Sequence, residues 1–455
     1  MDTVTLARAF FGTSLAFHII FATLAIGLSA MVFLSELIHY WKKDRDFGIL
    51  AKRWTKSVAI LLGVAIPSGT IVGVQLSLLW PGFMRIVGQV IAVPFQVEIF
   101  AFFLEALALS IYVYGADRLR PPYRVIAAFL VTLGATASAV LITSVNTWMN
   151  TPAGFKVKPN GTIYDVDPWK AFFNPSFYET AYHVVVSALM TGAFVIASVA
   201  AYRLLKTSQA ERLIHTKALM LSLVVAVAMS FLTALSGHES AQGLHEYTPE
   251  KLAAAEGLFK TQRYAPLAIG GYVDYRKKEI IGGIEVPYLL SFLAGNRFDT
   301  VVKGLEEFPR WTWPPAYTHT LFNVMVGIGF LLLGLAGLAL LVWWLRKRNG
   351  QPWWPKWLLY LLLPTGPLSI LGIEFGWIFS CSGRQPWTIY HIQTTAEAAT
   401  KAEHLGALFV AFALVYLFLG TLVCLVLTHY FKRHPIALDL KSNETLGEDT
   451  HGAAH

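Results

Sequence analysis

The chain has 455 residues, of which 55% are hydrophobic and only 14% are charged. This composition excludes an ordinary soluble protein and predicts an all-α, polytopic membrane protein. The formal net charge of +8 comes largely from loops expected at the inner membrane face, so it does not argue for nucleic-acid binding.

Nine apolar segments along the chain are each long enough to cross a bilayer, which takes about 20 residues. We expect them at 9–37, 57–80, 92–114, 125–145, 180–202, 218–236, 320–345, 357–380 and 405–430. The first is too long for a signal-peptide core and no small-residue cleavage site follows a basic start, so we predict a retained helix. The chain thus divides into helices 1 to 6 (1–236), a large outer loop (237–319), helices 7 to 9 (320–430) and a tail (431–455).

Basic residues gather in every second connection between these segments, after the first, third, fifth and seventh. They are Lys42, Lys43, Arg45, Lys52, Arg53, Lys56, Arg118, Arg120, Arg124, Arg203, Lys206, Arg212, Lys217, Arg346, Lys347, Arg348 and Lys356. Because basic residues in short loops stay on the cytoplasmic side, we predict an outer N-terminus and a cytoplasmic tail. The expected location is a bacterial or archaeal cytoplasmic membrane.

Two outer segments, 146–179 and 237–319, are too long to be simple turns. Loops of this length in compact proteins are usually functional or disordered. The larger segment is polar, yet its stretch 286–294 is apolar enough to pack. We therefore expect it to fold over the membrane face, with a disordered connector as the alternative.

Three residues that could bind a haem iron lie within the expected helices, each in the half nearest the outer face: His18, His183 and Met325. A histidine inside a membrane needs a partner, and neutral imidazole is a common ligand of haem iron. For either histidine alone, an interhelical hydrogen bond explains the position equally well. A thioether opposite an imidazole is typical of electron-transfer cytochromes, so His183 and Met325 form a candidate axial pair, although Met325 alone would indicate core packing.

Carboxylates also fall within the expected helices. Glu98 and Glu105 are seven residues apart, so they share a helix face and lie about 10 Å apart along the axis. Glu374 and Cys381 repeat this spacing on a later helix, and Cys424 lies too far towards the opposite membrane face to pair with Cys381. Membrane carboxylates are costly and often belong to proton routes, whereas pairing with a loop arginine is the structural alternative.

A Gly-Arg-Gln-Pro-Trp motif at 383–387 follows the eighth segment. Arg384 could neutralise a haem propionate and Trp387 could anchor the helix end, although an ordinary interfacial turn explains both. Further motifs are Gly376-Trp377, Phe-Phe-Leu-Glu at 102–105, Trp80-Pro81, Asp117-Arg118-Leu119 and the run from Lys251 to Glu256. With these motifs, the chain resembles subunit I of the cytochrome bd-type quinol oxidases over nearly its whole length.

The resemblance implies roles for particular residues. His183 and Met325 match the axial pair of a low-spin haem b. His18 matches the histidine ligand of one of two high-spin haems, which would be haem b together with haem d or a second haem b. Lys251 and Glu256 match residues of the quinol-binding loop.

Glu98 and Glu105 match acidic residues assigned to proton delivery and to the haem pair, and Trp377 matches an aromatic residue between haems. The implied function is a terminal quinol oxidase that reduces O2 to water and is electrogenic without pumping. The implied partners are subunit II and a small single-helix subunit, besides quinol, O2 and the lipid bilayer.

Two positions depart from the family pattern. Cys381 stands where the family has a glutamate haem ligand, so this site is open to a thiolate-bound haem, a haem held by Glu374 or water, or none. Asn323 stands where many members have an arginine, which should alter the surroundings of the low-spin haem. A haem-containing quinol dehydrogenase or sensor without oxygen reduction is therefore the alternative, and a transporter or scaffold without haem is a third reading.

Overall fold

The computed structural model describes residues 2–440 except 117, 207, 352, 403 and 404. Asp117 of the sequence motif and residues 441–455 of the expected tail lie outside the described residues. Within the described part, nine helical segments are long and apolar enough to cross a membrane, which confirms the predicted fold class. They are α1 (Thr3–Lys42), α2 (Arg45–Leu79), α4 (Val93–Gly115), α5 (Pro121–Asn150), α7 (Phe177–Lys206), α8 (Arg212–Tyr247), α11 (Tyr317–Arg348), α12 with α13 (Lys356–Leu362 and Thr365–Ser382) and α15 (Leu405–Arg433).

The eighth segment is broken into α12 and α13 at Leu363 and Pro364. Pro367, four residues after Leu363, has no N–H, so the Leu363 carbonyl lacks its usual helical partner. Ser198 of α7 donates its hydroxyl to the Leu363 carbonyl. The break is therefore stabilised by a neighbouring helix, as membrane burial of a backbone carbonyl requires.

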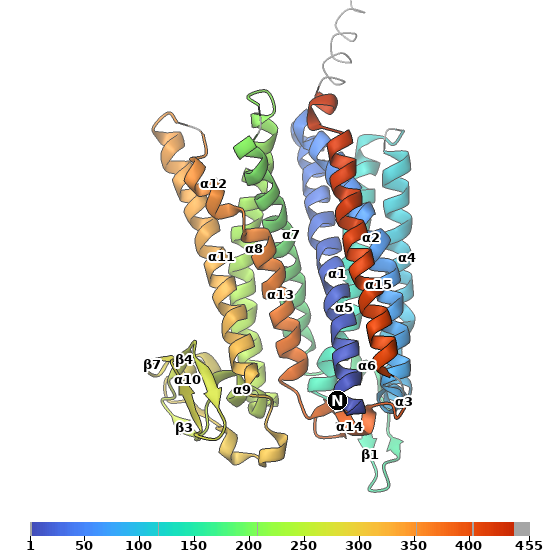
Figure 1. Ribbon diagram of the computed structural model, residues 1–455, viewed down its shortest axis with the longest axis vertical. Helices are drawn as coiled ribbons and strands as arrows, with labels where there is room; N and C mark the ends of the chain where they lie inside the picture. Colours follow the sequence, from blue (N-terminus) through green and yellow to red (C-terminus); the bar gives the residue numbers. More distant parts are fainter. Residues whose placement is uncertain (1, 117, 207, 352, 403–404, 441–455) are drawn as a thin grey trace, which may run out of the picture.

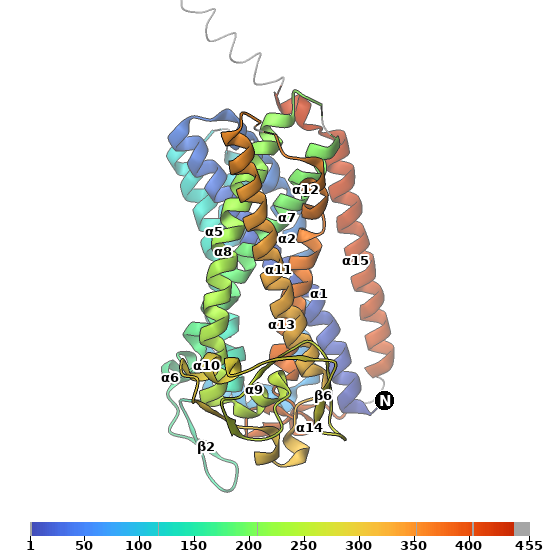
Figure 2. The same cartoon turned by 90° about the vertical axis from the view of Figure 1, so that its left-hand side faces the viewer.

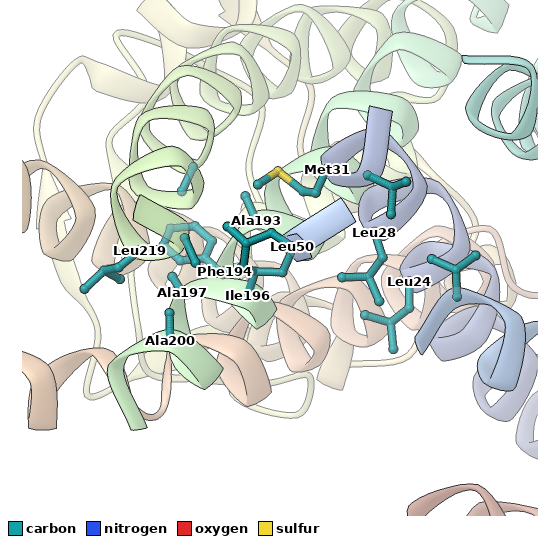
Figure 3. Close-up of a cluster of buried hydrophobic side chains, with 14 of the residues drawn as sticks. Leu24, Leu28, Met31, Leu50, Ala193, Phe194, Ile196, Ala197, Ala200 and Leu219 are labelled. Carbon is teal, nitrogen blue, oxygen red and sulfur yellow. The ribbon is translucent and has the colours of Figure 1, made fainter. Parts of the chain in front are cut away.

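The membrane-spanning helices form two groups that lie side by side (Figure 1). The first group consists of α1, α2, α4, α5 and α15, and the second of α7, α8, α11, α12 and α13. The groups meet where α1 packs on α7, and a Cβ on Gly27 would stand 2.6 Å from the Cα of Gly192. Glycines allow two membrane helices to approach this closely. Apolar side chains such as Leu28, Ala193 and Phe194 fill the rest of this junction (Figure 3).

Residues 248–316, called the cap below, cover one end of the second group (Figure 1). The cap contains α9 (Pro249–Glu256), β3 (Gln262–Arg263), β4 (Leu267–Ile269), β5 (Tyr272–Asp274), β6 (Glu279–Ile281), β7 (Ile284–Val286), α10 (Leu289–Gly295), β8 (Val301–Val302), η1 (Leu305–Glu307) and η2 (Arg310–Thr312). Its strands pair antiparallel as β3 with β8, β4 with β7 and β5 with β6. Leu252, Leu258, Leu290 and Val302 form a buried core. The cap is thus a folded layer and not a disordered connector.

The cap begins later than the loop expected at 237–319, because α8 continues to Tyr247. The last part of α8 is polar, so a search for apolar segments does not include it. The helix ends at Thr248, where φ is −137° and ψ is 59°. Pro249 explains this end, since a proline disfavours helical backbone at the residue before it.

The other long connections lie at the same end of the molecule as the cap and the N-terminus, which we call the cap face (Figures 1 and 2). They contain α3 (Pro81–Val90), β1 (Lys156–Val157), β2 (Ile163–Tyr164), α6 (Pro168–Phe172), β9 (Trp387–Ile389), β10 (Gln393–Thr394) and α14 (Thr395–Ala398). The four basic connections lie at the opposite end (Figure 1). This arrangement agrees with the predicted topology, while the compartment that each end faces remains a prediction.

Candidate functional site

His18 of α1 and His183 of α7 are held in the same way. Each lies in the half of its helix nearer the cap face. His18 Nδ1 is 3.0 Å from Ser68 Oγ of α2, and His183 Nδ1 is 2.9 Å from Ser236 Oγ of α8. The interhelical hydrogen bond considered as an alternative to metal binding is therefore present. It is compatible with metal binding, because it uses Nδ1 and leaves Nε2 as the ligand atom.

Met325 of α11 directs its sulfur towards α13. A Cβ on Gly376 would stand 3.0 Å from Met325 Sδ, so only a glycine there admits the thioether without displacement. Trp377 is the next residue of α13. Both α7 and α11 pack against α8 and α13. His183 and Met325 therefore belong to one helix bundle and lie towards its cap face.

Lys251 belongs to α9 of the cap but is buried against the end of α13. Its Nζ donates to the Ser380 carbonyl at 3.1 Å and to Asn150 Oδ1 at 3.3 Å. Burial lowers the pKa of Lys251 to about 7; Arg384 acts in the same direction, and Cys381 opposes it. The expected quinol residue Lys251 and the expected haem-site residue Cys381 thus lie close together.

Arg384 of the sequence motif is also buried. Its Nη2 lies 3.8 Å from Met149 Sδ, and its Nε and Nη1 have no hydrogen-bond partner among the described residues. Burial lowers the pKa of Arg384, and Cys381 opposes that shift. A guanidinium with open donors suits a carboxylate, which a haem propionate would supply. Trp387 lies in β9 with its ring 5.5 Å from that of Trp311, and so joins the motif to the cap.

Glu256 ends α9 and is buried, and its Oε2 has no partner within the described part of the chain. Burial raises the pKa of Glu256 to about 8. Five residues turn a helix through about 500°, so Glu256 and Lys251 point to different sides of α9. Glu256 and Lys251 are therefore buried on the same short helix without pairing.

His319, at the start of α11, joins the membrane helices to the cap, and the sequence analysis did not single it out. It is fully buried, with Nδ1 2.7 Å from the Ala255 carbonyl and Nε2 3.0 Å from the Gly270 carbonyl. Asn323, one turn later, accepts from the Gly270 N–H at 2.8 Å and donates to the His319 carbonyl at 3.1 Å. In the sequence, His319 could have been found from its spacing to Asn323, because two polar residues lie one turn apart at the start of a membrane helix. Asn323 therefore links the cap to α11.

Glu98 and Glu105 lie two turns apart on α4. Ser138 of α5 donates its hydroxyl to Glu98 Oε1 at 2.6 Å. Glu105 is buried, and its Oε1 has no partner in the part of the chain that is described. Two further turns lead to Tyr112, whose hydroxyl donates to Glu36 Oε1 at 2.6 Å. The sequence analysis missed Tyr112 because a tyrosine in an apolar helix is not unusual in itself.

Glu374 and Cys381 lie two turns apart on α13. Glu374 Oε1 is buried with no partner among the residues described. Cys381 is partly buried, and it and Cys424 are both free thiols, as predicted. The two candidate ligands of the second high-spin haem thus lie at different depths in the membrane: Cys381 is at the cap-face end of α13, and Glu374 is two turns deeper.

These observations test whether haem fits the site. His18 and His183 each leave Nε2 free to bind a metal. Gly376 leaves room for the Met325 sulfur, and the buried Arg384 has N–H donors without partners among the described residues. Within the described ranges, no group of three or more His, Cys, Asp or Glu side chains could hold a bare metal ion. Iron in haem needs only one or two protein ligands, so the donor set fits haem. The fold and the site together define a membrane-embedded haem protein of the electron-transfer class.

Comparison with known proteins identifies the family. The family model described as cytochrome bd terminal oxidase subunit I matches residues 6–435. A Bacillus subtilis (strain 168) protein named "Putative cytochrome bd menaquinol oxidase subunit I" is 57% identical over 447 residues, which cover 98% of this chain and 100% of the relative. The cytochrome bd ubiquinol oxidase subunit 1 of the same organism is 32% identical, with 95% and 94% covered.

A solved structure, the bd oxidase from Geobacillus thermodenitrificans, superposes with a TM-score of 0.89 at 40% identity, covering 95% of this chain and 99% of that one. The chain belongs to the family of cytochrome bd terminal oxidase subunit I. The expected resemblance and the terminal oxidase class are thereby confirmed at the level of the family, which implies haem cofactors.

Proposed function

We propose that this chain is the haem-bearing subunit of a quinol:oxygen oxidoreductase that oxidises quinol at the cap and reduces O2 to water. The observation that carries the proposal is the pair of histidines, each bound to a serine through Nδ1, near the cap face of a family member. Bound haem would supply one-electron transfer and the reduction of O2. Relatives are named as menaquinol and as ubiquinol oxidases, and both substrates present the same pair of hydroxyl groups.

Each expected ligand has a place in this proposal. His183 and Met325 would hold a low-spin haem b with two axial ligands, because both lie in the second helix group. His18 would hold a high-spin haem b or d with one protein ligand. Arg384 would neutralise a propionate through its open donors, and Trp377 would provide a flat apolar contact beside the Met325 sulfur.

Cys381 is our proposed ligand for the second high-spin haem, of b or d type. Two buried cations, Lys251 and Arg384, each interact favourably with a negative charge on Cys381. Positive neighbours stabilise a thiolate, and a thiolate ligand favours O–O cleavage. Glu374 is the competing ligand, because its buried carboxylate oxygen lacks a partner among the described side chains.

Glu256 and Lys251 are the proposed proton-handling residues of quinol oxidation. A group accepts protons best when its pKa lies near the working pH. The pKa values of about 8 for Glu256 and about 7 for Lys251 meet this condition. Glu256 would take a proton from a quinol hydroxyl on its side of α9, and Lys251 would accept or release a proton separately, on the side that faces the end of α13.

Protons for water formation would reach the first helix group through Glu105 and Glu98. This route is supported by the shared face of Glu98, Glu105 and Tyr112 on α4. Quinol protons would leave at the cap face, while these protons would enter from the opposite end. Turnover would therefore be electrogenic without pumping.

Subunit I works in this family with subunit II, quinol and O2. We propose in addition a small single-helix subunit, and a cytoplasmic membrane in which the N-terminus faces outside. Exposed apolar side chains on α4 and α15, which include Phe100, Phe103, Leu414, Leu417 and Phe418, support contact with lipid or with a partner helix.

A reduced-minus-oxidised optical spectrum with pigment extraction tests this function on the purified complex, together with O2 uptake driven by quinol. We expect b-type bands, with or without a chlorin band, and O2 uptake that requires quinol. Absence of haem would overturn the proposal. A low-spin band without O2 uptake would favour the quinol dehydrogenase or sensor, for which the Cys381 departure is the supporting observation.

A Cys381→Ser variant tests the ligand assignment, with Cys424→Ser as the matched control at an exposed cysteine. We expect Cys381→Ser to lose one high-spin haem while the low-spin band remains. Retention of all haems with unchanged spectra would exclude Cys381 as a ligand and favour Glu374.

A further inference from the structure

The two histidines share a detailed local arrangement that extends beyond their hydrogen bonds. Each faces a neighbouring helix in which a serine is followed directly by a glycine: Ser68 and Gly69 on α2, Ser236 and Gly237 on α8. Both serines are fully buried. The same dipeptide thus meets an imidazole at two places far apart in the sequence, and this recurrence is the basis of the inference.

The serine hydroxyls determine which imidazole nitrogen carries the proton. Ser68 Oγ donates its proton to the Ala65 carbonyl at 3.0 Å, and Ser236 Oγ donates to the Thr233 carbonyl at 3.0 Å. A hydroxyl has a single proton, so each serine oxygen can only accept from the histidine. Nδ1 is therefore the protonated nitrogen of both rings, and Nε2 carries the lone pair.

Each glycine lies beside Cε1 of its ring, the carbon between the two nitrogens. A Cβ on Gly69 would stand 2.9 Å from His18 Cε1 and 3.4 Å from His18 Nε2. A Cβ on Gly237 would stand 3.6 Å from His183 Cε1, which is ordinary van der Waals contact. A side chain at 69 would therefore displace its ring, whereas a methyl group at 237 would be accommodated.

We propose that Ser68 and Ser236 are positioning residues that select the tautomer and orientation of the two haem-ligating histidines and tune the reduction potential of each iron. The proposal rests on the function proposed above, in which His18 and His183 bind iron. A ligand histidine usually donates its second N–H to a protein group, which fixes the ring and raises the basicity of the ligand. Here a neutral hydroxyl takes that role, and its own donation to a backbone carbonyl holds it in the accepting orientation.

The direction of the effect follows from the electron density on Nε2. Removing the acceptor makes the imidazole a weaker donor to iron, which favours the ferrous state and raises the potential. Ser236→Ala should therefore raise the midpoint potential of the low-spin haem. Ser68→Ala should raise that of the haem on His18 by less, because the Ala65 carbonyl also accepts a hydrogen bond from His18. We expect a change of about threefold to tenfold in each reduction equilibrium, or about 28 to 59 mV for one electron.

Spectroelectrochemical titration of the purified complex measures both potentials in one sample. Each serine variant should shift only its own haem, so Ser68→Ala and Ser236→Ala serve as controls for each other. Ser222→Ala is a further matched control, because Ser222 is also fully buried on α8 and donates to the Leu219 carbonyl in the same way. A low-spin potential in Ser236→Ala equal to that in Ser222→Ala would overturn the proposal.

Paired variants keep the test valid if alanine impairs assembly. Ser236→Thr and Ser236→Val have nearly the same shape and differ in the hydroxyl, so only Val should shift the potential. Gly69→Ala should reduce occupancy or change the spectrum of the haem on His18, while Gly237→Ala should leave the low-spin spectrum intact. Equal potentials in the Thr and Val variants would contradict the proposal.

The two proposals fail in different ways. A wild-type complex without extractable haem would overturn the proposed function itself. Haems that are present, with potentials insensitive to both serines, would overturn only the positioning role.

Discussion

The first and second helix groups present a histidine in the same way but surround it differently. In the second group, His183 shares its bundle with Met325 and lies in the group that the cap covers (Figure 1). The first group contains His18 on α1 and, on α4, Glu98 and Glu105, and the cap does not cover its end (Figure 1). Both groups thus hold their histidine through a serine. Only the second group adds Met325 as a candidate second ligand, and only the second group is covered by the cap.

The comparison teaches that two adjacent helices are enough to present a ligand, but not enough to determine its role. A thioether on a third helix favours a six-coordinate iron suited to electron transfer. Carboxylates elsewhere in the helix group of the other histidine favour proton delivery. Variants that affect one group and spare the other therefore test this division most directly.

The largest expected effect is the loss of one haem signal. His183→Ala should abolish the low-spin spectrum, and His18→Ala should abolish a high-spin signal, because each removes the imidazole ligand. Both variants should lose quinol-driven O2 uptake. Optical and paramagnetic resonance spectra of the purified complexes check this, with exposed His429→Ala on α15 as the control.

The division between the groups would be wrong if either variant removed both signals in a complex that still assembles. Size-exclusion chromatography with subunit II confirms assembly. Selective loss of one signal in each variant would support two independent sites.

A smaller but still large effect is expected from Glu256→Gln in the cap. The quinol proton has to be accepted by the ionised carboxylate, so the wild-type rate should rise with pH towards a plateau above about 8. The variant should lose this dependence, and quinol-driven O2 uptake should fall about 100-fold. Glu105→Gln is the matched control in the first group: it should slow O2 uptake but leave anaerobic reduction of the low-spin haem by quinol unchanged.

Stability provides an independent check on Glu256. Its pKa is raised from 4.5 in the unfolded chain to about 8 in the fold. The unfolded state therefore releases this proton first, and the contribution of Glu256 to stability falls as pH rises from about 4.5 to about 8. Glu256→Gln should remove this decline in thermal unfolding experiments. An unchanged pH dependence of the melting temperature would contradict burial of the acid.

The smallest effect is expected at His319, which joins the cap to the second group. A neutral imidazole has one N–H, so His319 donates to one of the two cap carbonyls that it contacts, and loss of that hydrogen bond should cost about 1 kcal/mol. His319→Ala should therefore raise the KM for quinol about 5- to 10-fold and speed proteolysis of the cap, while both haem spectra remain unchanged. A changed low-spin spectrum, or an unchanged KM with unchanged proteolysis, would show that His319 does not act through the cap.

Much of this protein could be predicted from apolar segment length. Eight of the nine expected spans lie within one described helix, to within a residue at either end, and the ninth, 357–380, covers α12 and α13. The reason is that a backbone in lipid must form its own hydrogen bonds, and the sequence alone shows where lipid-compatible residues run. The polar end of α8 and the break at Pro364 were missed. Hydropathy does not detect a helix that continues into water, and a proline break depends on a partner such as Ser198.

The candidate site was predictable only in part. His18, His183, Met325 and Glu105 stood out because polar or ligand-capable groups are rare in apolar segments. Ser68 did not, since a serine in a membrane helix is common and most often bonds to its own backbone. Its proximity to His18, fifty positions away in the sequence, became visible only when α1 and α2 were packed together.

The sequence by itself determined the membrane spans, the alternation of basic loops and the identity of the candidate ligands, because each follows from local hydropathy, charge or side-chain chemistry. The tertiary structure alone decided which groups meet. It placed Lys251 of the cap beside the end of α13, His319 between cap carbonyls and a serine at each imidazole. The reason is physical: hydropathy is a property of a segment, whereas a hydrogen bond or an electrostatic neighbour is a property of two segments whose separation only packing determines.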